Sequence, residues 1–123
     1  MKNGKRVYLI DDDSSVRKAL KRFLVSLGIQ VDVFISSEDF LERMPSVAAG
    51  CLILDVRMPG LSGLELQDKL IASGLRFHII FITAYANPQD RKRALEAGAV
   101  AYLTKPVDDK ALMGALQEAE SRP

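Results

Sequence analysis

The chain holds 123 residues, the size of one domain with a single hydrophobic core. Its 17 basic and 16 acidic residues nearly cancel, which argues against nucleic acid or an anionic membrane as a partner attracted by overall charge. Apolar runs are of strand length, and no signal-type segment follows the charged start, so we expect one domain over residues 1–123 in the cytoplasm.

Cysteine and histidine each occur once. A single cysteine excludes an internal disulfide and a cysteine-based zinc cluster. The position of Cys51 at the head of an apolar run indicates an inert core side chain rather than a reactive thiol. His78 opens another apolar run and is interpreted as a strand-edge residue without a chemical role.

The first apolar run, residues 7–10, predicts a buried strand that stops at three consecutive acids, Asp11, Asp12 and Asp13. The third of these acids stands just before a helical pattern. We therefore interpret Asp13 as a helix-entry acid near the positive end of the helix dipole, in preference to a metal ligand.

The helix that follows is expected to be capped by Ser14 and Ser15 and to end at Gly28. Its apolar face comprises Val16, Ala19, Leu20, Phe23, Leu24 and Leu27. Its other face is a basic strip, either a solvated surface or a docking edge for an acidic partner, made of Arg17, Lys18, Lys21 and Arg22.

Residues 31–34 alternate apolar and polar, as in an edge strand that helices half cover. Ser36 and Ser37 then cap a short helix, which Pro45 terminates. The apolar residues of this helix are Phe40, Leu41 and Met44.

The centre of the chain contains an unbroken apolar run, residues 51–54, that stops at Asp55. Pro59 and Gly60 force a turn, which leads to a helix over residues 64–72. The expected core contacts of that helix are Leu66, Leu70 and Ile71. Asp55 thus lies at the C-terminal end of a strand, the edge of an open α/β sheet where ligands bind.

The last third repeats this pattern twice. Residues 79–82 predict a strand that ends at Thr83, and Pro88 opens a short, weakly amphipathic helix whose packing should be loose. Residues 100–103 predict the fifth strand, which Lys105 follows. A final helix places on one face Leu112, Ala115, Leu116 and Ala119.

Five strands alternating with five helices predict an α/β fold with a parallel sheet covered on both faces. The polar side chains that follow the strands should then meet at one edge: Asp11, Asp12, Asp55, Thr83 and Lys105. Because crowded carboxylates raise one another's pKa, we expect a divalent cation with oxygen ligands, Mg²⁺, among them. This set suits phosphoryl transfer to a carboxylate oxygen of Asp55, with Lys105 and Thr83 holding phosphoryl oxygens.

Four motifs in this order resemble those of two-component response-regulator receiver domains, and the likeness covers essentially the whole chain. They are Ile10-Asp11-Asp12-Asp13, the stretch from Leu54 to Gly63, Ile82-Thr83-Ala84 and Lys105-Pro106. The details around Asp55 and before Lys105 are most similar to receivers of nitrogen-fixation-type transcriptional regulators with LuxR-class outputs. The resemblance implies a flavodoxin-like, doubly wound (βα)5 sandwich with strand order 2-1-3-4-5.

The resemblance also implies roles around the acidic pocket. Asp55 would be the phosphoacceptor. Asp12 and Asp55 would ligate Mg²⁺ directly, the backbone carbonyl of Arg57 would complete the protein ligands, and Asp11 would act through a bound water.

Further implied roles concern switching. The hydroxyl of Thr83 would move to the phosphoryl group and the ring of Tyr102 would swing into the vacated space, although Tyr102 also fits a half-buried strand residue. Lys105 would bind the phosphoryl group, positioned by a cis bond to Pro106. Tyr85 and the Arg57 side chain are expected to flank the pocket and to tune the phosphoryl lifetime.

The implied partner is a sensor histidine kinase that donates the phosphoryl group, so the chain would be a signalling phosphoacceptor rather than an enzyme. We expect homodimer formation on phosphorylation, through the face of the fourth helix, fifth strand and fifth helix. No motif for nucleic-acid or membrane binding occurs. The chain is expected to be either a stand-alone receiver or a receiver whose output domain has been cut away, and the similarity to transcriptional regulators favours the second by analogy.

Two alternatives are a receiver-like binding module that works without phosphorylation and a haloacid-dehalogenase-type phosphohydrolase. The complete set of acids, threonine and lysine argues against the first. The second requires another acid two residues after the nucleophile, where this chain has Arg57, and a cap insertion for which the chain has no room.

Overall fold

The computed structural model describes residues 6–44 and 49–122. In this part of the chain five strands alternate with five helices, as predicted. In chain order they are β1 (Arg6–Ile10), α1 (Ser14–Ser26), β2 (Gln30–Phe34), α2 (Ser37–Arg43), β3 (Ala49–Asp55), α3 (Gly63–Ala72), β4 (Arg76–Thr83), α4 (Pro88–Glu96), β5 (Ala101–Thr104) and α5 (Asp109–Ser121). The predicted end of α2 at Pro45 lies outside the described residues.

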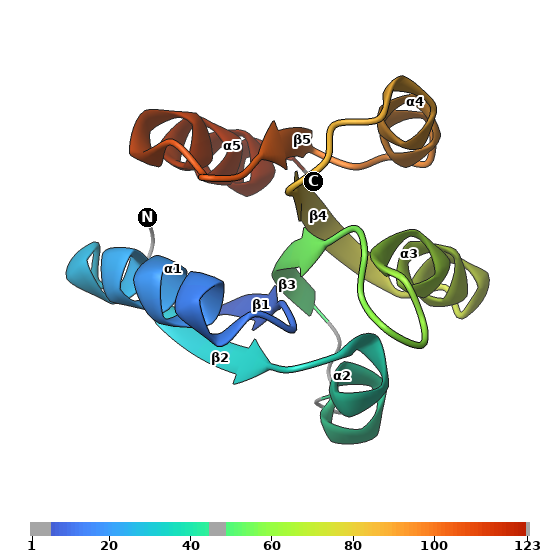
Figure 1. Ribbon diagram of the computed structural model, residues 1–123, viewed down its shortest axis with the longest axis horizontal. Coiled ribbons are helices and arrows are strands. Elements are labelled where there is room, and N and C mark those ends of the chain that lie inside the picture. Colours follow the sequence, from blue (N-terminus) through green and yellow to red (C-terminus); the bar gives the residue numbers. More distant parts are fainter. Residues whose placement is uncertain (1–5, 45–48, 123) are drawn as a thin grey trace.

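The strands form one parallel sheet in the order β2-β1-β3-β4-β5, which confirms the predicted flavodoxin-like topology. Helices α1 and α5 cover one face of this sheet, and α2, α3 and α4 cover the other (Figure 1). Strand β3 lies in the middle, paired with both β1 and β4.

The unbroken apolar run of β3 reflects burial on both faces of the sheet. Leu52 and Leu54 belong to the core under α2, α3 and α4, whereas Cys51 and Ile53 belong to the core under α1 and α5. The inert core position predicted for Cys51 agrees with its burial. Aromatic rings pack edge to face in the first core, with Phe40 of α2 between its neighbours Tyr8, Phe34 and Phe77.

The predicted N-cap of α1 is wrong, and two residues of its predicted apolar face are exposed. The N-cap is Asp13 rather than Ser14 or Ser15, because the Asp13 carboxylate accepts hydrogen bonds from the backbone N–H groups of Ser15 and Val16. Leu27 is 40% exposed because it occupies the C-cap position, where the chain turns away from the helix. The side chain of Ala19 is also exposed.

Helix α3 is capped by Ser62, which forms a reciprocal capping box with Glu65. Leu66 and Leu70 are buried as predicted, whereas Ile71 is 51% exposed. Ile71 shares a helix face with Gln67, which is buried, but Ile71 lies in the last turn of α3, next to the helix end at Ala72.

Helix α4 is sparsely packed, as predicted, because Ala94 is its one fully buried side chain. Polar contacts attach it to its neighbours. Arg57 forms an ion pair with Asp90 at 2.7 Å, Arg93 forms one with Asp68 at 2.6 Å, and Gln67 Nε2 donates to the Ala94 carbonyl at 3.1 Å. None of the helices in the described part of the chain combines the length and the apolar composition that a membrane crossing requires.

Gly63 closes the loop between β3 and α3. Its N–H donates to the Val56 carbonyl at 2.9 Å, and a Cβ at this position would collide with the backbone carbonyl of Asp55. A Cβ on Gly114, in the exposed part of α5, would meet nothing within 4 Å.

We expect Gly63→Ala to lower the free energy of unfolding by about 1–3 kcal/mol, because the loop must shift to admit the methyl group. Gly114→Ala is the matched control and should raise the same quantity by roughly 0.5–1 kcal/mol, since alanine favours the helix. Urea denaturation of both variants measures the two changes. A Gly63→Ala protein as stable as the parent would contradict the close approach.

Candidate functional site

Strand register brings the predicted side chains to one edge of the sheet. Ile10 is paired with Leu54, so the chain leaves β1 and β3 at nearly the same level. Asp55 is in turn paired with Ile82, and Thr83 with Thr104. The side chains at the ends of these strands therefore lie side by side at the C-terminal edge. This edge includes the point between β1 and β3 where the strand order reverses, and in open α/β sheets ligands bind at such a point.

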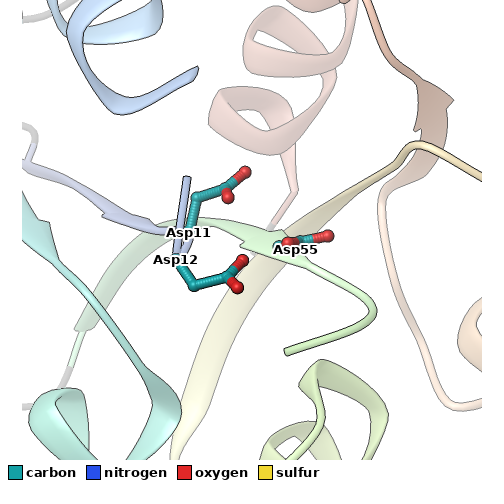
Figure 2. Close-up of side chains that lie close together, drawn as sticks. All are labelled: Asp11, Asp12 and Asp55. Carbon is teal, nitrogen blue, oxygen red and sulfur yellow. The ribbon is translucent and has the colours of Figure 1, made fainter. Parts of the chain in front are cut away.

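Three carboxylates meet there. Asp11, Asp12 and Asp55 each offer an oxygen atom within 4.8 Å of the others. Figure 2 shows their side chains close together where β1 and β3 end. Asp11 and Asp55 are buried, whereas Asp12 is exposed.

Asp11 is the most enclosed member of the cluster and is fully buried. Its Oδ1 accepts the backbone N–H of Asp13 at 2.9 Å, and its own N–H donates to the Phe34 carbonyl at 3.2 Å. Its Oδ2 lies 2.9 Å from Lys105 Nζ and has no further hydrogen-bond partner within the described residues. One buried oxygen is thus balanced by a single cation.

Lys105 reaches two of the acids. Its Nζ lies 3.4 Å from Asp55 Oδ2 as well as 2.9 Å from Asp11 Oδ2. Burial lowers the pKa of Lys105, but the hydrogen bonds and negative charges of Asp11 and Asp55 outweigh it and leave that pKa raised. The ammonium is therefore firmly charged.

Burial and the neighbouring charge of Asp11 raise the pKa of Asp55 to about 7, although Lys105 acts in the opposite direction. A carboxyl group with so high a pKa is one whose charged form is poorly stabilised. A second positive charge, in addition to that of Lys105, would stabilise the charged form of Asp55.

The chemistry of this donor set fits a hard divalent cation. Carboxylate oxygens are the ligands that Mg²⁺ prefers, and the cluster combines an exposed acid with a buried oxygen that has one cationic neighbour. Soft metals would be expected to select thiolate or imidazole, and neither is in this group within the described residues.

Thr83 lies at the end of β4 and is 1% exposed. Its hydroxyl donates to the Tyr85 carbonyl and accepts the Tyr85 N–H, both at 3.1 Å. Moving this hydroxyl toward Asp55 would break both bonds. Tyr102 lies on the neighbouring strand β5 with its ring 6.4 Å from that of Phe81, and its buried hydroxyl has no hydrogen-bond partner within the described residues.

The remaining predicted residues lie around this centre. The peptide bond between Lys105 and Pro106 is cis. The Arg57 side chain is turned to α4, where it pairs with Asp90 at 2.7 Å. Tyr85 is 75% exposed.

Sequence reasoning missed two contacts that hold the loops of the site. Arg17, assigned only to a basic strip, donates from Nη1 to the Asp11 carbonyl at 2.7 Å. Glu38 of α2 accepts the Leu61 N–H at 2.8 Å and so ties α2 to the loop after Asp55. The sequence gives the number of residues between Arg17 and the acids, but it does not identify the backbone carbonyl to which the Arg17 side chain donates.

Comparisons with known proteins agree with this geometry. A family model described as the response regulator receiver domain matches residues 7–117. The response regulator protein TodT of Pseudomonas putida is 42% identical over 113 residues, which cover 92% of this chain and 50% of TodT. The transcriptional regulatory protein FixJ of Bradyrhizobium diazoefficiens is 36% identical over 113 residues, which cover 92% of this chain and 55% of FixJ.

Solved structures give the same result. A crystal structure of FixJ-N matches with a TM-score of 0.89 and 33% identity, covering 100% of this chain and 98% of that one. The response regulator StyR matches with a TM-score of 0.87 and 42% identity, covering 94% of this chain and 58% of StyR. The chain spans about half the length of the curated relatives it matches.

The raised pKa of Asp55 predicts how stability depends on pH without metal. An unfolded aspartate titrates near pH 4, so between about pH 4 and 7 the folded protein holds a proton that the unfolded chain has released, and stability must fall as pH rises. Asp55→Asn removes this dependence. We expect the variant to gain stability over the parent by roughly 1–3 kcal/mol more at pH 8 than at pH 5.

Urea denaturation with a chelator present, at both pH values, measures this difference. Asp109→Asn on α5 removes an acid far along the chain from the cluster and serves as the control. An equal advantage of Asp55→Asn at the two pH values would contradict the raised pKa.

Proposed function

Because the chain belongs to the response regulator receiver domain family, we propose that it carries a phosphoryl group on Asp55 in a two-component signalling system. A receiver domain is a signalling phosphoacceptor rather than a conventional enzyme. The observation that carries the assignment of Asp55 is the meeting of three acids within 4.8 Å, with Lys105 close to two of them. We propose that residues 1–123 act as one receiver domain.

The proposed donor is the phosphohistidine of a sensor histidine kinase. A carboxylate oxygen of Asp55 attacks the phosphorus in line with the leaving imidazole. The new O–P bond forms as the N–P bond breaks, and the electron pair of that bond stays on the imidazole nitrogen. Asp55 must be ionised to attack, so its raised pKa makes a bound cation important for reaction at neutral pH.

Asp12 and Asp55 would hold Mg²⁺ directly, together with the backbone carbonyl of Arg57, and Asp11 would hold it through a water. When bound, Mg²⁺ supplies positive charge against the carboxylates and the phosphoryl oxygens. Lys105 lies 3.4 Å from Asp55 Oδ2 and so is close enough to pair with an oxygen of the transferred group. Arg57 and Tyr85 would tune how long that group survives, through access of water.

Thr83 and Tyr102 would couple phosphorylation to the surface. The Thr83 hydroxyl would exchange its two bonds to the Tyr85 backbone for one to the phosphoryl group. The space that it leaves would admit the ring of Tyr102, whose hydroxyl is already buried. The affected face comprises α4, β5 and α5, and α4 has little apolar packing to hold it.

The output would be transcriptional. FixJ and the Thauera aromatica relative TdiR are described as transcriptional regulatory proteins, and this chain covers about half of each. By analogy we propose a cytoplasmic receiver that controls a separate output domain and does not itself bind nucleic acid.

Acetyl phosphate with Mg²⁺ should add the mass of one phosphoryl group to the protein, as intact mass spectrometry measures. Asp55→Ala should show no addition, because the acceptor oxygen is gone, and a chelator should prevent addition to the parent. Asp109→Ala, which removes an acid of α5, is the control and should react as the parent does. Phosphorylation of Asp55→Ala to the same extent would overturn the assignment.

Phosphorylation should raise self-association. Sedimentation velocity of the parent with Mg²⁺ and the phosphate mimic beryllofluoride is expected to show a larger species that the untreated protein lacks. Thr83→Ala should bind the mimic but associate less, because the hydroxyl that couples the site to Tyr102 is missing. A monomer in both states at high protein concentration would count against this surface.

A further inference from the structure

Arg17 differs from the rest of the basic strip on α1. Lys18, Lys21 and Arg22 are exposed, whereas Arg17 is half-buried. Its guanidinium Nη1 donates to the backbone carbonyl of Asp11 at 2.7 Å, across an interval of six residues. A charged donor at this distance makes a strong hydrogen bond to a carbonyl.

The carbonyl that Arg17 meets belongs to the peptide unit joining Asp11 to Asp12. Rotation of this unit would change the direction in which the chain enters Asp12, which is exposed and lies two residues beyond Ile10, the last paired residue of β1. The N–H of Asp11 is bonded to Phe34, and its Oδ1 accepts the N–H of Asp13. The hydrogen bond from Arg17 therefore holds the carbonyl of Asp11, the backbone group that these two bonds do not involve.

Asp13 joins the same arrangement from the other side. Its carboxylate caps α1, and its carbonyl accepts the backbone N–H of Arg17 at 3.0 Å. Arg17 therefore binds both ends of the short segment that carries Asp12, through its side chain at Asp11 and its backbone N–H at Asp13. A rigid helix in this way sets the direction of an exposed acid.

We propose that Arg17 is a positioning residue for Asp12 and thereby raises the affinity of the acidic cluster for Mg²⁺. This inference rests on the function proposed above. The guanidinium is itself positive, so by charge alone it would weaken the binding of a cation. Positioning and charge predict changes of opposite sign when the side chain is replaced, and this makes the two separable.

The test is calorimetric titration of the complete chain with MgCl₂. Arg17→Met keeps an apolar stem but removes the donor, and we expect the Kd for Mg²⁺ to rise about 3- to 30-fold, as loss of a partner behind a metal ligand does. Lys18→Met is the matched control, since it removes the same charge one residue further along α1. Its Kd should stay within about 2-fold of the parent value or fall slightly.

Arg17→Lys supplies the rescue, because an ammonium keeps both the charge and a donor and should recover part of the lost affinity. In metal-free protein, the backbone amide resonances of Asp12 and Asp13 should move in Arg17→Met and not in Lys18→Met. Arg17→Leu, which also lacks a donor, replaces Arg17→Met in the same comparison should the latter not fold, with Lys18→Leu as its control.

Equal Mg²⁺ affinities for Arg17→Met and Lys18→Met would overturn the positioning role while leaving the proposed function intact. A parent-like affinity of Arg17→Met would also overturn it, since the donor would then have no effect. A parent protein that binds no Mg²⁺ overturns the proposed cofactor, and the inference with it.

Discussion

The repulsion among Asp11, Asp12 and Asp55 is the constraint on which the rest of the site depends. Carboxylates this close cannot all be charged without a compensating cation, and burial of two of them removes the help of water. Lys105, which follows the edge strand β5, supplies one positive charge at the same C-terminal edge. The pKa of about 7 for Asp55 shows that this charge is insufficient by itself.

The fold supports this unfavourable cluster by holding the backbone around it rigidly. Strand register aligns the chain ends, α1 binds the segment after β1, and α2 and α3 bind the loop after β3 through Glu38 and the Ser62–Glu65 capping box. Since nearly every one of these bonds ends on a backbone group, they keep the acids near one another without neutralising them. Part of the stability gained in the two apolar cores is thereby offset at the edge that carries the chemistry.

The sequence was sufficient for the architecture and for the meeting of the three acids and Lys105 at one edge of the sheet. Apolar runs that stop at polar residues locate the carboxyl ends of β1, β3 and β4, and parallel pairing then makes Asp11, Asp55 and Thr83 neighbours. What a one-dimensional pattern lacks is the direction of a side chain within a loop. Ser14 and Asp13 are both good caps by type, and only the extended backbone at Asp13 decides between them.

The same limit explains the other differences. Ile71 fits an apolar stripe by spacing, yet it lies in the last turn of α3 and is exposed, whereas the polar Gln67 is buried and donates to the Ala94 carbonyl of α4. Arg17 fits a basic strip by spacing, yet its length lets it fold back to a carbonyl that no periodicity identifies. Long polar side chains bind at a distance from their own Cα, so their partners follow from tertiary structure alone.

The attachment of α4 has a consequence for the conditions under which the domain works. In each of the two ion pairs of α4 at least one side chain is largely exposed, and such a pair contributes about 1 kcal/mol or less to the free energy of unfolding. Dissolved ions screen these pairs but leave apolar packing almost untouched, so raising ionic strength loosens α4 while both cores stay intact. The resting position of α4 is therefore coupled to the salt content of its surroundings.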